Sequence, residues 1–304
     1  MGNAPLISIL MNCFNGQTYL RKALDSVLSQ TYQNWELIFW DNQSEDKSAE
    51  IFKSYKDKRF KFFYSSKHTI LYEARNNAIQ KTNGDLIAFL DTDDYWLPEK
   101  LEKQIKLFRD DKVGLVYGNY WIINDQSFFS KKIYSKKRLP TGNVLNAILL
   151  NYSVGLPTVI IRKKYLQNVK KVFNTQYDLL ADYDFVINFS IKNKFECVQN
   201  PVVCYRLHEK STSLILINKQ ISQLKLWYSS IQSHPILSSQ EGIKKVSERI
   251  NYMEAMQIIL KRNFYQGFFQ VIQFPFGFKK LKLIIALILP KSIFLKLKKI
   301  LIIR

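Results

Sequence analysis

The sequence predicts an α/β protein with a mostly parallel sheet, and three observations lead to this fold class. Short apolar runs alternate with segments of helical period through the first hundred residues. The runs lack the polar alternation of half-exposed strands, so we expect strands that are covered on both faces, as in parallel sheets. Polar clusters directly follow three of the runs, at 12–15, 41–46 and 91–94. Ligands of such sheets bind beyond the carboxyl ends of the strands, which predicts one site at that edge.

The first ninety residues predict four strands with three helices between them. The expected strands are Leu6–Met11, Trp35–Trp40, Phe60–Tyr64 and Leu86–Leu90. The expected helices are Thr18–Gln30, Ser44–Tyr55 and Ile70–Lys81. Apolar residues at helical spacing mark the first helix, and acids at the start of the second favour its N-terminus. Asn83-Gly84-Asp85 is a turn signal before the fourth strand.

The second half is less regular. The expected elements are a helix over Pro98–Phe108, a strand over Val113–Tyr117, a basic excursion over Trp121–Arg138, a helix over Asn143–Asn151, a strand over Leu156–Ile161, a helix over Asp182–Lys192, and strands over Phe195–Val198 and Val202–Leu207. Pro157 predicts that its strand lies at an edge or begins late, because proline cannot donate to a sheet. Beyond Ser213 the pattern is helical, with candidate helices over 214–232, 241–265, 279–289 and 291–303.

Charge divides the chain into two parts. The formal net charge of the 304 residues is +20, and residues 211–304 hold 15 basic and 3 acidic residues. We therefore expect a catalytic domain over 1–212 and a basic helical region over 213–304. Such a region suits nucleic acid, an anionic membrane or a phosphorylated substrate. Alternatively, it is a solvated basic surface.

Cysteine usage and the N-terminus indicate a cytoplasmic protein. Cys13, Cys197 and Cys204 form neither a disulfide framework nor a zinc pattern, so each is expected to be a small buried residue. The N-terminus lacks the pattern of a secretory signal. The sequence contains no run of 18 apolar residues, so a membrane-spanning helix is not expected.

Three carboxylates crowd into four positions at Asp91, Asp93 and Asp94, directly after an apolar run. A divalent cation, Mg²⁺ or Mn²⁺, would offset their mutual repulsion, and such cations bind carboxylates together with substrate phosphates. The alternative is that Asp93 or Asp94 caps the helix that begins near Leu97. The chain contains neither GxxxxGK[ST] nor GxGxxG, so it has no P-loop or dinucleotide fingerprint.

Four stretches together resemble family 2 glycosyltransferases of the GT-A fold, a nucleotide-diphospho-sugar transferase fold with a Rossmann-like sheet. They are Asn12-Cys13-Phe14-Asn15, Asp41-Asn42-x-Ser44-x-Asp46-x-Ser48, Glu73-Ala74-Arg75-Asn76 and Gly84-Asp85-Leu86-Ile87-Ala88-Phe89-Leu90-Asp91-x-Asp93-Asp94. Their order and spacing match throughout, and the resemblance covers residues 5–210. It implies an enzyme that transfers a sugar from a nucleotide-sugar donor, most often UDP-linked.

The resemblance also implies roles for individual residues. Asp41 would bond the base of the donor, Phe14 and Asn15 would line the donor site, Arg75 would lie beside base and ribose, and Asp91 would reach the ribose or metal side. Asp93 would bind the divalent cation that bridges the diphosphate. Asp94 is left open as a ligand, a partner of the ligands or a helix cap. Thr158, in Gly155-Leu156-Pro157-Thr158, would fall near the acceptor, as would residues 120–140.

Inverting members of the family use a carboxylate as general base, in a Glu-Asp pair that opens a helix. Asp182 matches this base, whereas Ala181 replaces the preceding Glu and puts that residue's contacts in doubt. The alternatives are that Asp182 is a helix cap or that Asp184 is the base. The later stretch Tyr205-Arg206-Leu207-His208-x-x-Ser211-x-Ser213 matches a family motif. It implies that His208 lies near the metal and that Arg206 and Ser211 contact phosphate.

The last 26 residues interleave lysine with leucine and isoleucine. This pattern predicts interfacial helices on an anionic membrane, and with it a peripheral enzyme at the inner face of the cell membrane. A glycan or polyprenyl-linked acceptor would fit that location, and nucleic acid is not expected as a partner. The alternative functions are a nucleotidyltransferase on a related sheet and a non-catalytic basic module that binds membrane or nucleic acid.

Overall fold

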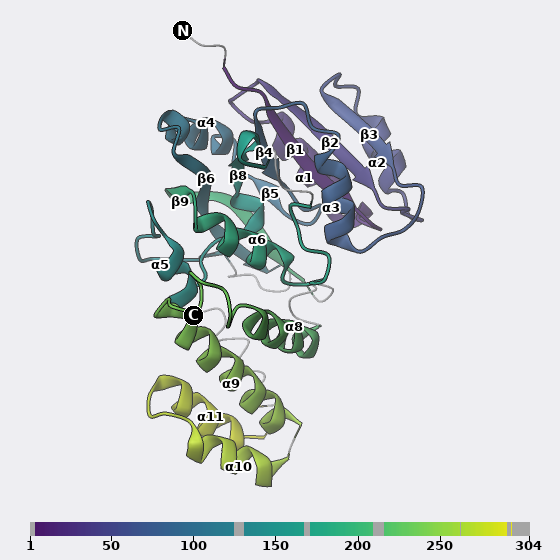
Figure 1. Cartoon of the computed structure of the whole chain (residues 1–304). Helices are drawn as coiled ribbons and strands as arrows, with labels where there is room; N and C mark the ends of the chain where they lie inside the picture. Colours follow the sequence, from purple (N-terminus) through teal and green to yellow (C-terminus); the bar gives the residue numbers. More distant parts are fainter. Residues whose placement is uncertain are drawn as a thin grey trace. The chain divides into compact units, whose positions relative to one another are not determined.

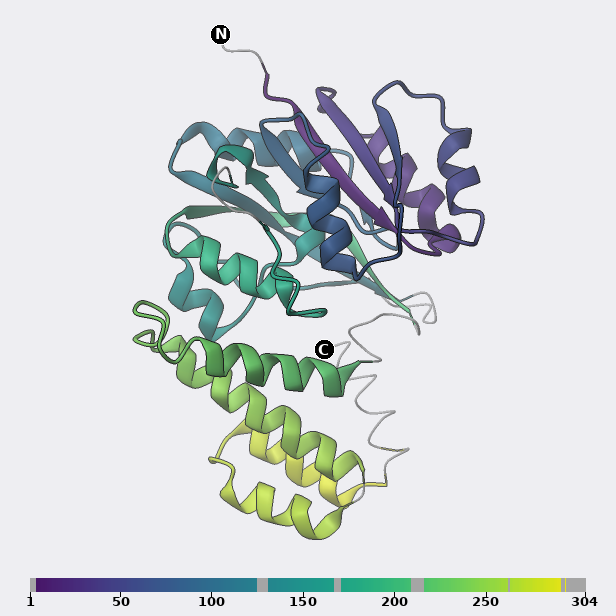
Figure 2. The same ribbon diagram turned by 45° about the vertical axis from the view of Figure 1, so that its right-hand side comes forward.

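The computed structural model describes residues 4–124, 131–166, 171–208, 216–261, 263–290 and 293. The chain forms two compact units, Met1–Glu209 and Lys210–Arg304 (Figures 1 and 2). Each unit is described by itself. None of the described helices has the length and apolar content needed to cross a membrane.

The first half of the first unit is a parallel sheet. Its strands are β1 (Ile7–Cys13), β2 (Trp35–Asp41), β3 (Phe60–Tyr64) and β4 (Leu86–Phe89), in the order β3-β2-β1-β4. The helices between them are α1 (Gln17–Leu28), α2 (Ser48–Ser54) and α3 (Leu71–Ile79). Cys13 lies beside Asp41, and Asp41 lies beside Tyr64, so three strands end in one row. The apolar runs thus form the predicted parallel strands.

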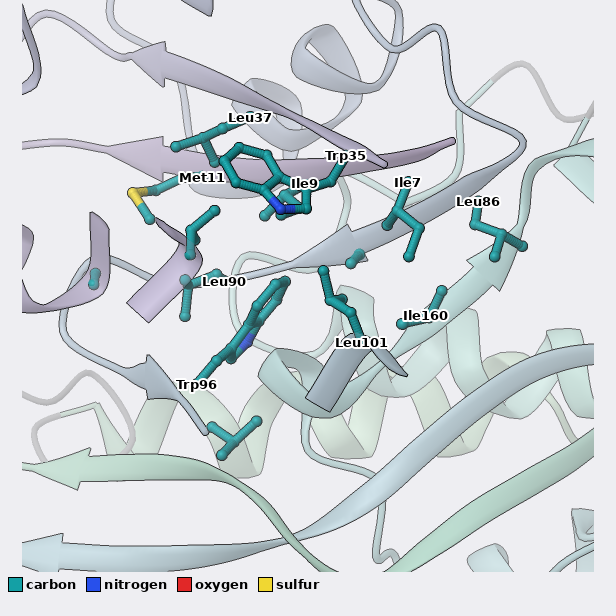
Figure 3. Packing of buried hydrophobic residues seen from close by; sticks show 14 of the residues in the cluster. Ile7, Ile9, Met11, Trp35, Leu37, Leu86, Leu90, Trp96, Leu101 and Ile160 are labelled. Atoms are coloured by element: carbon teal, nitrogen blue, oxygen red, sulfur yellow. The ribbon is translucent and has the colours of Figure 1, made fainter. Parts of the chain in front are cut away.

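Helices cover both faces of this sheet. On one face Ile7, Ile9 and Met11 of β1 pack with residues of α1, α2 and α4 (Lys100–Ile105). Trp35, Leu86, Leu90, Trp96, Leu101 and Ile160 belong to the same buried cluster (Figure 3). On the other face the Phe89 ring lies 5.6 Å from the ring of Phe173, which in turn lies 5.5 Å from Phe185. Burial on both faces explains why these strands lack polar alternation.

The second half of the first unit extends the sheet with mixed strands. β6 (Val113–Asn124) and β9 (Lys194–Leu207) pair in parallel, β8 (Ile160–Arg162) pairs antiparallel with β4 and β6, and β7 (Lys131–Ile133) pairs with β6. β5 (Tyr95–Trp96) is antiparallel to β9. The remaining helices are η1 (Lys106–Arg109), α5 (Leu145–Leu150), η2 (Leu156–Thr158), η3 (Lys163–Leu166) and α6 (Ala181–Ser190).

Several expected boundaries are wrong for identifiable reasons. The helix expected over Ser44–Tyr55 begins at Ser48, because the polar side chains before it bind other backbone groups. Of the two alternatives for the strand expected over Leu156–Ile161, the late start is correct, because η2 precedes β8, which begins at Ile160; the edge position is wrong, because β8 lies inside the sheet. The start of the excursion expected over Trp121–Arg138 continues β6, and the two strands expected after 194 are one, β9.

The second unit is helical as expected. Its described helices are α8 (Ile217–Ser230), α9 (Gly242–Leu260), α10 (Phe264–Gln273) and α11 (Phe278–Ile288). The helix expected over 241–265 ends at Leu260, and α10, most of which lies outside the predicted helices, follows it. The Asn263 side chain accepts a hydrogen bond from the Gln266 backbone N at 3.2 Å and caps α10. The helix expected over 291–303 falls, apart from position 293, outside the described residues.

Candidate active site

Two loops bind each other at the carboxyl edge of β1 and β2. The Asn15 backbone N donates to Ser44 Oγ at 3.1 Å, Gly16 N to Ser48 Oγ at 3.0 Å, and Gln17 N to Asp46 Oδ2 at 2.9 Å. These side chains therefore satisfy the free backbone N–H groups at the start of α1. The polar residues Ser44, Asp46 and Ser48, which follow β2 two positions apart, thus hold the two loops together.

Asn15 is part of this network of hydrogen bonds between the two loops. Its side-chain Oδ1 accepts a hydrogen bond from the Glu45 backbone N at 2.8 Å, and its φ of 53° lies in the left-handed region. Asparagine tolerates this conformation better than most residues. The structure thus places Asn15 beside the expected donor site, with its side chain engaged in the loop.

Asp41 and Phe14 lie next to this network of hydrogen bonds. Asp41 is fully buried, and its Oδ1 accepts from the Ser44 backbone N at 2.8 Å. Its Oδ2 is buried without a hydrogen-bond partner among the residues that the structure describes. Phe14 is 52% exposed, and its ring lies 4.4 Å from the His68 ring. An unsatisfied acceptor beside an exposed aromatic ring suits a planar base that carries an N–H donor.

His68 was not expected near the site. Its Nδ1 lies 2.9 Å from the Asn42 carbonyl oxygen, directly after Asp41. The Asn42 side chain in turn donates to the Thr69 carbonyl at 2.7 Å. The loop after β3 is thereby fixed against the end of β2, and this pairing has no signature in the local sequence.

Arg75, in the middle of α3, and Asp91, just after β4, form an ion pair. Arg75 is 4% exposed, whereas the Asp91 side chain is 34% exposed. Burial has the largest single effect and would lower the pKa of Arg75, but Asp91, Tyr72 and Asp182 together outweigh it and the pKa is raised. The site therefore contains a buried guanidinium that is held in place, with a partly exposed carboxylate beside it.

Asp182, in α6, lies near this pair through Tyr72, whose ring centre is 5.1 Å from the Arg75 guanidinium carbon. The Tyr72 hydroxyl donates to Asp182 Oδ1 at 2.8 Å. Burial raises the pKa of Asp182, while Arg75 and the Tyr72 hydrogen bond act in the lowering direction. A carboxylate with a raised pKa in this setting is suited to accept a proton.

The alternatives for Asp182 and Asp184 are distinguished by position. Leu180 is the N-cap of α6, and Asp182 lies within the first turn, so Asp182 is not the cap. Asp184 Oδ1 accepts a hydrogen bond at 2.9 Å from Asn188 on the same helix. Tyr72 was missed from the sequence, because an aromatic residue on a helix face has the pattern of a core residue.

The acidic cluster meets the end of β9. Asp93 Oδ2 lies 3.0 Å from His208 Nε2, and the Arg206 Nε donates to the Asp93 carbonyl at 2.9 Å. The two-residue strand β5, which pairs with β9 next to them, brings these residues together. Burial and the nearby Asp91 carboxylate raise the pKa of Asp93, and His208 acts against them.

Asp94 lies deeper than its neighbours, at 2% exposure. Its Oδ1 accepts from the Arg206 backbone N at 2.8 Å, so it connects the acidic loop to β9. The helix-cap alternative for Asp93 and Asp94 is wrong, because α4 has Glu99 as its N-cap. Of the three positions left open for Asp94, the structure favours the partner of the other residues.

Two further expected residues lie elsewhere. Thr158 is 1% exposed, and its hydroxyl donates to the Gly155 carbonyl at 2.7 Å, so it is buried in η2. Ser211 lies outside the described residues. Both assignments remain predictions.

The residues present fit a divalent cation in part. Among the described residues no group of three His, Cys, Asp or Glu side chains is arranged to hold a metal. Asp93 and His208 form a pair of suitable donors, and burial together with the nearby Asp91 carboxylate raises the pKa of Asp93. Mg²⁺ and Mn²⁺ commonly take one or two protein ligands and complete their shell with phosphate and water.

Several known proteins resemble this chain in sequence. The profile of the family "Glycosyl transferase family 2" matches residues 8–169. The UDP-Glc:alpha-D-GlcNAc-diphosphoundecaprenol beta-1,3-glucosyltransferase WfgD of Escherichia coli is 31% identical over 210 residues, 68% of this chain and 79% of that protein. The putative teichuronic acid biosynthesis glycosyltransferase TuaG of Bacillus subtilis is 28% identical over 230 residues, 68% of this chain and 89% of that protein.

Solved structures show the same fold. Residues 1–349 of S. aureus TarS in complex with UDP-GlcNAc align with a TM-score of 0.60 at 15% identity, over 91% of this chain and 78% of that one. The mannosyltransferase PcManGT from Pyrobaculum calidifontis, with GDP-Man and Mn²⁺, aligns with a TM-score of 0.60 at 14% identity, over 82% and 71%. The expected GT-A fold is confirmed, and the chain belongs to the family 2 glycosyltransferases.

Proposed function

We propose that this glycosyltransferase is metal-dependent and inverting, and that it transfers a sugar from a UDP-sugar to a hydroxyl of a lipid-linked glycan. The observation that carries the proposal is the hydrogen bond from Tyr72 to Asp182 beside the Arg75–Asp91 ion pair. A carboxylate at the edge of the sheet where the donor would bind can remove the proton from an attacking hydroxyl. A single displacement assisted in this way inverts the sugar carbon.

The chain's own residues divide the work between the two substrates. Asp41 and Phe14 bind the base of the donor, and Arg75 and Asp91 hold the ribose side. Asp182 takes the proton of the acceptor hydroxyl, with Tyr72 holding the carboxylate in place. Asp93 and His208 would hold the divalent cation, which supplies positive charge to the departing diphosphate.

The relatives support the substrate classes. The name of WfgD gives UDP-Glc as donor and an alpha-D-GlcNAc-diphosphoundecaprenol as acceptor, and TuaG is named for teichuronic acid synthesis. A polyprenyl-linked acceptor lies in a membrane. We therefore also propose a peripheral location at the cytoplasmic face of that membrane.

A donor screen tests the function. Purified protein is incubated with UDP-, GDP- and dTDP-sugars in Mn²⁺ or Mg²⁺, and release of the nucleoside diphosphate is followed. We expect slow release of UDP from one UDP-sugar, abolished by a chelator and accelerated by a polyprenyl-diphosphate-linked acceptor. Failure of every nucleotide sugar, together with absence of metal-dependent UDP binding, would overturn the proposal.

A further inference from the structure

An exposed apolar surface runs along α10, the turn after it and α11. We call it the aromatic surface. It consists of Phe264, Tyr265, Phe268, Phe269, Ile272, Phe276, Phe278, Leu281, Ile285 and Ile288. Each is at least 39% exposed, and Phe276 in the turn is 101% exposed. Soluble proteins rarely expose so many large apolar side chains in one stretch, so this surface requires an explanation.

The aromatic surface is separate from the core of the second unit. The opposite faces of α10 and α11 bury Val271, Phe274 and Leu283. These side chains pack on Met256 and Ile259 of α9. Phe264, Phe268 and Ile272 follow one another four residues apart, so they form a second apolar stripe on α10. An ordinary surface helix would carry polar residues there.

The charges around the aromatic surface have one sign. Lys279, Lys280 and Lys282 lie in the first turns of α11, and the sequence contains no acidic residue after Glu254. The Lys282 Nζ lies 4.7 Å from the centre of the Phe278 ring, and Lys280 Nζ donates to the Ile272 carbonyl at 3.0 Å. Lys280 and Lys282 therefore lie beside the exposed residues, whereas the Nζ of Lys279 lies 5.9 Å from the centre of the Tyr252 ring of α9.

This combination selects one kind of partner. A symmetric contact between two copies would bring the lysines of both together, which is unfavourable. An anionic bilayer accepts both features, since aromatic side chains favour the headgroup region and lysines neutralise acidic lipids. We propose that the aromatic surface inserts into the interface of an anionic membrane, with α10 and α11 in its plane.

The proposal deepens the peripheral location given under Proposed function, and it names the surface that provides it. It assigns most of the binding to α10 and the turn at Phe276, which the lysine-rich pattern of the last 26 residues did not single out. Point substitutions are preferable to truncation as a test, because α11 supplies Leu283 to the core of the second unit.

The test is sedimentation of the full chain with vesicles of phosphatidylcholine alone or with one quarter phosphatidylglycerol. We expect binding to the anionic vesicles. The double variant F268S/F276S should lower the partition coefficient at least about tenfold. K280Q/K282Q should lower it by more than about tenfold on anionic vesicles and little on neutral ones.

Leu226→Ser is the matched control, since Leu226 is an apolar residue 45% exposed on α8, outside the aromatic surface. It should bind vesicles as the unchanged chain does. UDP release from free donor should be the same in every variant, so failure of the proposed reaction is separable from failure of this proposal. Equal vesicle binding by F268S/F276S would overturn it. The proposal would also be overturned if the unchanged chain did not bind vesicles but formed a dimer in light scattering that F268S/F276S dissociated.

Discussion

Replacing Tyr72 with Phe removes one hydroxyl from the surroundings of Asp182 and leaves the ring in place. That hydroxyl donates to Asp182 Oδ1 at 2.8 Å and is one of the interactions that lower the pKa of a carboxylate whose pKa burial raises. A hydrogen bond to a charged group contributes about 1.5–3 kcal/mol. Arg75 still stabilises the ionised form, so we expect the pKa of Asp182 to rise by about one unit.

The sign of the effect on activity follows from the role of Asp182. A general base works when it is ionised, so raising its pKa shifts the acid limb of the pH–rate profile to higher pH by about one unit. Below the limb, transfer should fall about tenfold, and well above it most of the rate should return. The assay is kcat for sugar transfer with saturating donor, measured across pH in the unchanged enzyme and in Tyr72→Phe.

Tyr117→Phe is the control for this measurement. It removes a buried tyrosine hydroxyl that donates to the Pro140 carbonyl at 2.7 Å. It should cost stability of about 1 kcal/mol and leave the acid limb in place. An unmoved limb in Tyr72→Phe, with the rate lowered equally at every pH, would refute the reasoning about Asp182.

The remaining predictions concern the metal, the base pocket and stability. Asp93→Ala should abolish metal-dependent UDP binding in calorimetry; binding that keeps its metal dependence contradicts the assignment. Phe14→Ala should raise KM for the donor about tenfold with little change in kcat, and an unchanged KM would place the base elsewhere. Although burial opposes it, Lys61, Ser8 and Asn83 lower the pKa of Glu36 to about 2, from 4.5. Ionised Glu36 thus stabilises the fold above about pH 4.5. The difference in unfolding free energy between the unchanged enzyme and Glu36→Gln should narrow by about 2–3 kcal/mol as pH falls from 4.5 to 2, and a constant difference in urea unfolding argues against it.

The apolar runs of the first ninety residues predicted β1 to β4 because burial on both faces leaves a plain signature in the sequence. The acidic cluster was located for the same reason, since it follows β4 directly. The contact between Asp93 and His208 depends on β5, which has two residues and therefore no period that a pattern could reveal. Only the family motif pointed to His208.

The residues that the sequence did not reveal have ordinary local contexts. Tyr72 lies on α3 among buried residues, and its role depends on α6 arriving beside it from a distant part of the chain. His68 lies in a loop and meets Phe14 only because β2 and β3 end in one row. No helix was predicted over most of α10, and the structure shows which of its aromatic residues are exposed.

The measurement that tests the central claim most directly is Asp182→Asn, assayed in parallel for sugar transfer and for UDP binding. The substitution keeps the shape of the side chain and removes its ability to accept a proton. The account predicts loss of transfer by a factor of about a hundred or more, with UDP binding unchanged. Transfer at the normal rate, or loss of UDP binding together with transfer, would contradict the role of Asp182 as the base.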